Sequence, residues 1–266
     1  MSERHLALRL QYDGSAFHGS QRQAGQATVQ ETLEEAIGQL TQEAHRTAFA
    51  GRTDTGVHAL GQVVAVRTRS ALPPERWIRG LNHLLPPQVA VQDAREVPPD
   101  FDPRRDARSR TYRYDWCPAR NRQPLLEPRA WVFAGQVDFP ALRDGAARLI
   151  GEHDFASFCA KPGNRGTVRT MDAVEVGDFV EDGVERIHLT FRGASFLHHQ
   201  IRFTVGQLVR IGIGKAEPAV IDRLLQEPVI GTAGPKAPAQ GLVLVRVRYD
   251  TPELADWNDD EDVRPV

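Results

Sequence analysis

Cysteine is scarce in this chain of 266 residues, where only Cys117 and Cys159 occur. They stand far apart, with no Cys-X-X-Cys pair and no Cys/His cluster, so neither a disulfide scaffold nor a structural zinc site is indicated. Long apolar runs are also missing, and the opening residues lack the basic, then apolar, pattern of a signal peptide. We therefore expect a cytoplasmic protein without a membrane span.

Lysine is nearly absent as well: three lysines stand among 33 basic residues, so 33 − 3 = 30 are arginines. Arginine binds phosphate through a planar, bidentate fork, although a GC-rich genome would also favour it. The formal net charge of −2 hides an asymmetry, because residues 251–266 sum to −5 and leave −2 − (−5) = +3 on the remainder. Segregated charge of this kind is compatible with a nucleic-acid partner despite the negative total.

The arginines crowd around one tyrosine. Between residues 104 and 122 only Asp106 and Asp115 oppose the basic side chains near Tyr112, which are Arg104, Arg105, Arg108, Arg110, Arg113, Arg120 and Arg122. A basic stripe with an aromatic inside it is typical of a nucleic-acid-binding face. A solvated strand edge with alternating arginines is the alternative.

Residues 6–94 alternate strand and helix patterns. Leu6 to Tyr12 alternate as a strand, and Thr28 and Glu31 form a capping box ahead of a helix that runs to about residue 44. A short apolar run at 46–50, a strand at 62–68, a helix after Pro74 and a strand at 89–94 follow. The order strand, helix, strand, strand, helix, strand is that of the ferredoxin-like plait.

The second half repeats this order loosely, with helices near 139–150 and 195–211 and strands near 111–116, 171–178, 185–191 and 242–249. We therefore expect an α+β protein of two ferredoxin-like halves, forming a mainly antiparallel sheet with a central active-site cleft. Prolines near residue 100 suggest the boundary between an N-terminal half at 1–103 and a C-terminal half at 104–250. Residues 251–266 then form a disordered or peripheral acidic tail.

Asp54 is the strongest candidate for chemistry. It stands in the polar loop Gly51-Arg52-Thr53-Asp54-Thr55-Gly56-Val57-His58, between two apolar, strand-forming runs. Loops on a rigid sheet commonly carry reactive side chains, and glycines on both sides free the backbone. Arg52 could hold the carboxylate ionised and aimed. The alternative is an ordinary capped turn with a surface salt bridge.

This loop and several other segments resemble the tRNA pseudouridine synthase A family, in which a G-R-T-D-x-G-V-H loop carries the catalytic aspartate. The resemblance extends to Tyr12 through Gly19 with Gln21-Arg22-Gln23, to the strand around Tyr112, to the helix that carries Arg202, and to the strand from Leu242. These segments cover residues 6 to about 249. The chain departs from the family pattern at Ser20, where Trp is usual, and at His198, Gln200 and Phe203.

The resemblance implies that uridine in tRNA is isomerised to pseudouridine, with cleavage of the C1′–N1 bond and formation of a C5–C1′ bond. Asp54 would be catalytic, either by attacking C1′ or by removing a ribose proton, since positive charge develops at C1′ as it does in glycosidases. Tyr112 would stack on the flipped uracil, and Arg202 would match the family arginine that pairs with the catalytic aspartate. Tyr112, Arg52 and Arg202 together would bind the substrate. Phosphate contacts are expected from Arg22, Arg104, Arg108, Arg110 and Arg113.

The same resemblance implies a homodimer that modifies positions 38, 39 and 40 of the tRNA anticodon stem-loop, without any cofactor. No metal site is predicted, because His58, His198 and His199 have no carboxylate or cysteine at ligand spacing in the sequence. Two other classes of protein match parts of the sequence. Asp54-Thr55-Gly56 is also the motif of aspartic proteases, but these need two such aspartates and the chain has one copy. A non-catalytic RNA-binding module would leave the Asp54 loop unexplained.

Overall fold

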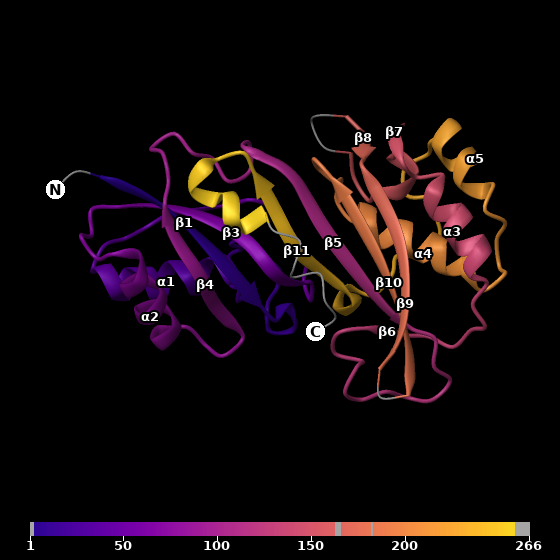
Figure 1. Cartoon of the computed structure of the whole chain (residues 1–266), viewed down its shortest axis with the longest axis horizontal. Helices are drawn as coiled ribbons and strands as arrows, with labels where there is room; N and C mark the ends of the chain where they lie inside the picture. The colour runs from indigo at the N-terminus through magenta and orange to yellow at the C-terminus, as the bar shows by residue number, and fades with distance from the viewer. Residues whose placement is uncertain (1–2, 163–165, 182, 259–266) are drawn as a thin grey trace. The chain divides into compact units, whose positions relative to one another are not determined.

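The structure is a computed structural model, and it describes residues 3–162, 166–181 and 183–258. Helices and strands are mixed along the chain, and the strands pair mainly in antiparallel fashion (Figure 1). The chain divides into two compact units. The first consists of Met1–Arg110 with Val243–Val266, and the second of Thr111–Leu242.

The first unit is built on a sheet in which the strands follow the order β4-β1-β3-β11, with β2 also paired to β3. Its strands are β1 (Arg4–Tyr12), β2 (Thr47–Phe49), β3 (His58–Thr68), β4 (Val89–Glu96) and β11 (Leu242–Tyr249). All the pairings among β1 to β4 are antiparallel, whereas β11 runs parallel to β3. Leu6, Leu8 and Leu10 alternate along β1 and are fully buried, so this strand forms the centre of the core.

Two helices complete the core of this unit. Helix α1 (Val29–Thr41) begins at Thr28, whose hydroxyl accepts the N–H of Glu31 at 3.3 Å, as the capping box predicts. It ends earlier than expected, because Gln42 takes a left-handed conformation (φ 60°) and caps the helix by donating its N–H to the Gly38 carbonyl. Helix α2 (Pro74–Leu84) packs against β4 and buries Trp77 and Leu81. The predicted element order of residues 6–94 is therefore confirmed.

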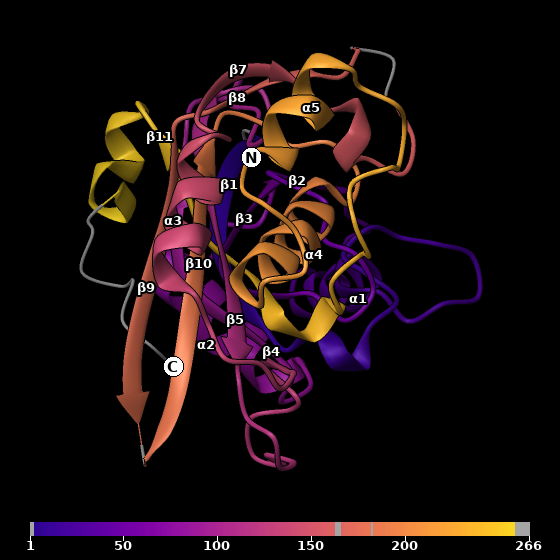
Figure 2. The same cartoon turned by 90° about the vertical axis from the view of Figure 1, so that its right-hand side faces the viewer.

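The second unit contains the order β5-β10-β9, with β6 paired to β5, and a separate pair of strands, β7 and β8. Helix α3 packs against α4 and β9 (Figure 2). The bounds are β5 (Ala107–Cys117), which starts in the first unit, β6 (Trp131–Val132), α3 (Phe139–Ala147), β7 (Gly151–Asp154), β8 (Val168–Met171), β9 (Ala173–Glu181), β10 (Val184–Gly193), α4 (Gln200–Gly212) and α5 (Val220–Gln226). The predicted strands and helices are present, and β6, β7, β8 and α5 were not predicted.

Two differences from the sequence-based division have clear physical causes. The last strand belongs to the first unit, since it pairs with β3 through Val243↔His58 and Leu244↔Ala59. Residues 252–258, expected in a disordered or peripheral tail, instead form a 3₁₀ helix, η4 (Pro252–Asn258), that buries Leu254 and Trp257. The Trp257 indole donates to Asp93 at 2.9 Å. Residues 259–266 lie outside the described part of the chain.

Helix α4 starts five residues later than predicted, at Gln200, because His199 is left-handed (φ 64°) and interrupts the helical path. The Gln200 side chain accepts the N–H of Leu197 at 2.7 Å and so closes the turn that leads into the helix. In the described residues, none of the helices is long and apolar enough to cross a membrane.

Candidate active site

Asp54 lies on the loop between β2 and β3, in the first unit. Its side chain is half-buried, whereas the neighbouring Arg52 and Thr55 are exposed. The N–H of Val57 donates to the Asp54 carbonyl at 3.1 Å and closes a turn, in which Gly56 is left-handed (φ 80°). The loop therefore presents a carboxylate at a tight turn, as the glycine spacing predicted.

Buried side chains hold the residues that precede Asp54. The Gln62 side-chain amide, fully buried on β3, donates to the Gly51 carbonyl at 2.9 Å and accepts the Gly51 N–H at 3.3 Å. Ser20, also fully buried, does the same for Thr53: its Oγ accepts the Thr53 N–H at 2.9 Å, and its N–H donates to the Thr53 carbonyl at 3.0 Å. Both backbone groups of Gly51 and Thr53 are thus paired.

Tyr12 supports the same loop through a side chain. Its hydroxyl lies 2.8 Å from Thr53 Oγ1 and accepts from Gln62 Nε2 at 3.3 Å. Burial raises the pKa of Tyr12 to about 12, with the hydrogen bonds to Thr53 and Gln62 acting in the opposite direction. Tyr12 is therefore protonated at neutral pH. Either hydroxyl can donate in the contact between Tyr12 and Thr53, because the Tyr12 oxygen can accept from Gln62 and from Thr53 together.

Two glycines allow the N-terminal segment to approach the loop closely. A Cβ on Gly14 would lie 2.0 Å from the Val57 carbonyl oxygen, and a Cβ on Gly19, where φ is +89°, would lie 2.8 Å from the Thr53 carbonyl oxygen. The N–H of Gly14 also donates to His58 Nδ1 at 3.1 Å, just beyond the loop. Larger residues at Gly14 or Gly19 would push this segment off the loop.

The arginines predicted to contact RNA separate into two groups. Arg22, Arg104 and Arg108 are exposed. Arg22 pairs with Glu31 and Glu34 at 3.2 Å each, and Arg108 pairs with Asp250.

Arg110 and Arg113 form the other group, because both are buried. Arg110 donates to the Ala50 carbonyl at 2.7 and 3.1 Å and to the Arg104 carbonyl at 2.8 Å, and Arg113 pairs with Asp115 at 3.0 Å. Burial removes Arg110 and Arg113 from the expected phosphate contacts. Arg110 instead supports the start of the Asp54 loop.

In the second unit, Tyr112 and Arg202 have well-defined surroundings. Tyr112 is 7% exposed on β5, and its ring packs edge-on against Phe196, with centroids 5.4 Å apart and an interplanar angle of 86°. Arg202 is half-buried on α4, and its Nε donates to the Ala237 carbonyl at 2.8 Å. Burial raises the pKa of Tyr114, a change that the charge of Arg202 opposes.

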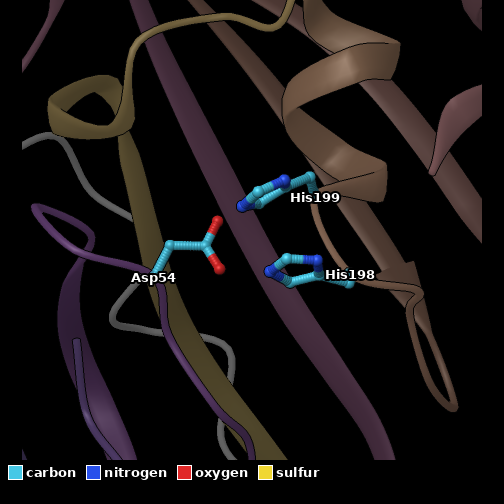
Figure 3. A group of neighbouring side chains, drawn as sticks. All are labelled: Asp54, His198 and His199. Atoms are coloured by element: carbon cyan, nitrogen blue, oxygen red, sulfur yellow. The ribbon is translucent and has the colours of Figure 1, made fainter. Parts of the chain in front are cut away.

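His198 and His199 precede α4. Their rings stack with centroids 3.7 Å apart and an interplanar angle of 29° (Figure 3). Figure 3 also labels Asp54, which belongs to the first unit and whose carboxylate extends from its loop. The stack lies directly before α4, at the left-handed His199 (φ 64°).

The residues that support the loop were not predicted from the sequence. The position of Gln62 directly before the apolar run from Val63 to Val66 does indicate such a role, since a polar amide buried there has to be hydrogen-bonded. In the sequence, Ser20 is marked only by its departure from a family pattern, and Tyr12 only by its place in a motif. Arg110 looked like a surface cation, and nothing in the sequence distinguishes it from Arg108.

Known proteins resemble this chain over most of its length. A family model described as tRNA pseudouridine synthase matches residues 10–105 and 146–250. The tRNA pseudouridine synthase A of Geobacter sulfurreducens is 40% identical over 250 residues, covering 92% of this chain and 100% of that protein. The protein of the same name from Neisseria meningitidis serogroup B is 40% identical over 259 residues, covering 94% of this chain and 96% of its own.

The matched residues include Arg52, Asp54 and Arg202, together with Tyr12, Ser20 and Gln62, whereas Tyr112 lies between the two matched segments. Similarity on this scale leaves no basis for grouping the Asp-Thr-Gly sequence with aspartic proteases, or for a non-catalytic RNA-binding module. Because the family model covers most of the chain and relatives align along nearly their whole length, the chain belongs to the tRNA pseudouridine synthase family.

Proposed function

We propose that this protein isomerises uridine to pseudouridine in tRNA, and that Asp54 is the catalytic residue. The observation that carries the proposal is the carboxylate at the turn of a loop whose preceding backbone is fixed by buried hydrogen bonds, in a chain of this family. Cleavage of the C1′–N1 bond develops positive charge at C1′, and a fixed carboxylate suits that charge.

Asp54 has two chemical routes in this proposal. In the first, its oxygen attacks C1′ as the C1′–N1 bond breaks, and the sugar ester then breaks as C5 of the turned uracil bonds to C1′. In the second, it removes a ribose proton as the uracil leaves by elimination, and it returns that proton when C5 adds to C1′. In both routes the uracil loses a proton from C5 and gains one at N1. Both routes retain all the substrate atoms, so neither an oxidant nor a group donor enters the proposal, and no metal or organic cofactor is included. A carboxylate close to the sugar is the common requirement.

Tyr112, Arg52 and Arg202 are proposed to bind the flipped nucleotide. Stacking on an aromatic ring offsets the cost of unstacking the target base, each on the order of 1–3 kcal/mol. Support for Tyr112 comes from its motif and from Phe196, which holds its ring edge-on. The exposed Arg52 and the half-buried Arg202 supply positive charge for an anionic sugar-phosphate.

The finer features of the proposal extend the family resemblance. The substrate is the anticodon stem-loop, at positions 38 to 40, and the protein acts in the cytoplasm as a homodimer. Each half of the chain is a ferredoxin-like unit in this proposal, and the strand order and antiparallel pairing of β1 to β4 support it for the N-terminal half. Arg22, Arg104 and Arg108 contact phosphates.

Replacement of Asp54 by asparagine tests the central proposal. The amide has nearly the same size but is neither a nucleophile nor a base, so we expect pseudouridine formation to fall by more than about a thousandfold while tRNA affinity and fold are kept. Asp100→Asn, at an exposed carboxylate of the same unit, is the matched control and should be fully active. Turnover by Asp54→Asn close to that of the parent would exclude Asp54 as the catalytic group.

A further inference from the structure

We propose that Tyr12, Ser20 and Gln62 are positioning residues for Asp54, which fix the direction of its carboxylate through the backbone that precedes it. The inference rests on the proposed function, since it concerns groups that hold the proposed catalytic residue. None of the three needs to touch the substrate. Their contribution is to keep the loop in one conformation while the reaction proceeds.

Hydrogen bonds to buried side chains hold the backbone on both sides of Arg52. Gly51 and Thr53 flank Arg52, and each is bonded through both its N–H and its carbonyl to one buried residue, Gln62 or Ser20. The peptide that links Thr53 to Asp54 contains the Thr53 carbonyl, which accepts from the Ser20 N–H at 3.0 Å. Rotation of that peptide would break this bond, and with it the orientation of the Asp54 side chain would change.

Side-chain hydrogen bonds also link Gly51 to Thr53. Gly51 fixes the Gln62 amide, because its N–H requires the Gln62 oxygen and its carbonyl requires the nitrogen. With that orientation Gln62 donates to the Tyr12 hydroxyl, which is itself hydrogen-bonded to Thr53 Oγ1 at 2.8 Å. Gly51 and Thr53 are thus linked through a chain of two side chains, so a change at one of them reaches the other.

Ser20 supports the Thr53 backbone from a fully buried position. The small hydroxyl fits between the N-terminal segment and the loop, and the adjacent Gly19 brings its own backbone close to the Thr53 carbonyl. Removal of the hydroxyl would leave the Thr53 N–H buried without its acceptor.

A role limited to packing predicts a different result. In that case, substitutions would lower the melting temperature while kcat, measured well below melting, stayed unchanged. A positioning role predicts a loss in kcat at unchanged KM, because substrate binding does not depend on the aim of the carboxylate. The two roles are therefore separable by steady-state kinetics combined with thermal unfolding.

The experiment measures pseudouridine formation in a tRNA transcript by the parent and by Ser20→Ala, Tyr12→Phe, Thr53→Val and the double variant Tyr12→Phe with Thr53→Val. We expect kcat to fall by about tenfold or more in each single variant, with KM within about twofold. The double variant should lose no more than the worse single one, since both remove the same hydrogen bond. Thr53→Ser, which keeps the hydroxyl, should restore kcat.

Tyr249→Phe is the control, because Tyr249 is a buried tyrosine of the same unit whose hydroxyl donates to the Pro103 carbonyl, outside the loop. It should keep the parental kcat. Unchanged kcat in Ser20→Ala and Tyr12→Phe would overturn the inference, as would additive losses in the double variant. If Ser20→Ala does not fold, Tyr12→Phe carries the test. Activity in Asp54→Asn would instead overturn the proposed function, so the two failures are distinguishable.

Discussion

The loop around Asp54 and the stretch at residues 104–110 are both polar, but they differ in which groups are buried. Buried side chains bind the backbone of the loop, whereas the stretch itself supplies a buried side chain that binds backbone carbonyls elsewhere. In the loop, the backbone groups of Gly51 and Thr53 bond to buried side chains, and Arg52 and Thr55 reach the solvent. In the stretch, Arg104 and Arg108 reach the solvent, and the guanidinium of Arg110 is buried.

The difference between Arg108 and Arg110 is the more instructive one. The two residues stand two positions apart on β5, so the pleat of a strand directs both side chains to the same face. Their neighbours separate them: Arg108 meets the exposed carboxylate of Asp250, whereas Arg110 meets the carbonyls of Ala50 and Arg104. Whether an arginine of the basic stripe is exposed or built into the fold therefore depends on its neighbours across the structure.

Truncation of Arg110 and Arg104 tests this contrast with the largest expected effect. Arg110→Ala leaves the buried Ala50 carbonyl without its partner and opens space beside the loop, so the free energy of unfolding should fall by about 2–3 kcal/mol. Arg104→Ala should change it by less than about 0.5 kcal/mol, because the side chain is exposed. Urea unfolding of both variants measures the difference, and equal losses would abolish the distinction.

Tyr112 extends the comparison to the second unit, where a buried side chain is proposed to serve the substrate. Tyr112→Leu should lose more in kcat/KM than in tRNA affinity, by a factor that corresponds to about 1–3 kcal/mol, since phosphate contacts persist while stacking is lost. Tyr112→Phe keeps the ring and should retain stacking. Equal losses of activity and affinity in Tyr112→Leu would indicate a tyrosine that only supports the fold.

The pH dependence of the free energy of unfolding reports on the burial of the Tyr12 hydroxyl, which supports the loop. The pKa of Tyr12 in the folded state is raised to about 12 by burial, from 10.0. The stabilisation is fully present below the unfolded pKa and is lost as pH rises through the window from about 10 to about 12. Urea unfolding between about pH 9 and pH 12 should show this decline, and it should be shallower in Tyr12→Phe. An identical decline in that variant would place the titration at other tyrosines.

The smallest expected effects are changes in the salt dependence of tRNA affinity when single exposed arginines are replaced. Arg104→Gln and Arg108→Gln should each lower the slope of log affinity against log salt by about one unit at most. Arg22→Gln should change it less, because Arg22 is paired with two carboxylates, those of Glu31 and Glu34, whereas Arg108 is paired with one, that of Asp250. Arg76→Gln, at an exposed arginine of α2, removes the same charge and should leave the slope unchanged. Unaltered binding in all the variants would place the RNA elsewhere.

Local sequence patterns determined much of this protein. The alternation of Leu6, Leu8 and Leu10 and the capping box at Thr28 predicted β1 and the start of α1, because side-chain period and end capping are local properties. The glycines beside Asp54 predicted its turn for the same reason. The end of α1 at Thr41 was less predictable, since it depends on a left-handed glutamine, which no composition rule requires.

The tertiary structure alone decided what lies opposite each polar group. It assigned the last strand to the first unit through its pairing with His58 and Ala59, and it buried Trp257 of a segment that is acidic in sequence. It also brought Ser20 and Tyr12 to Thr53 across more than thirty positions of chain. Hydrogen bonds between distant residues depend on where the core places each backbone group, and that placement is a property of the whole packed chain.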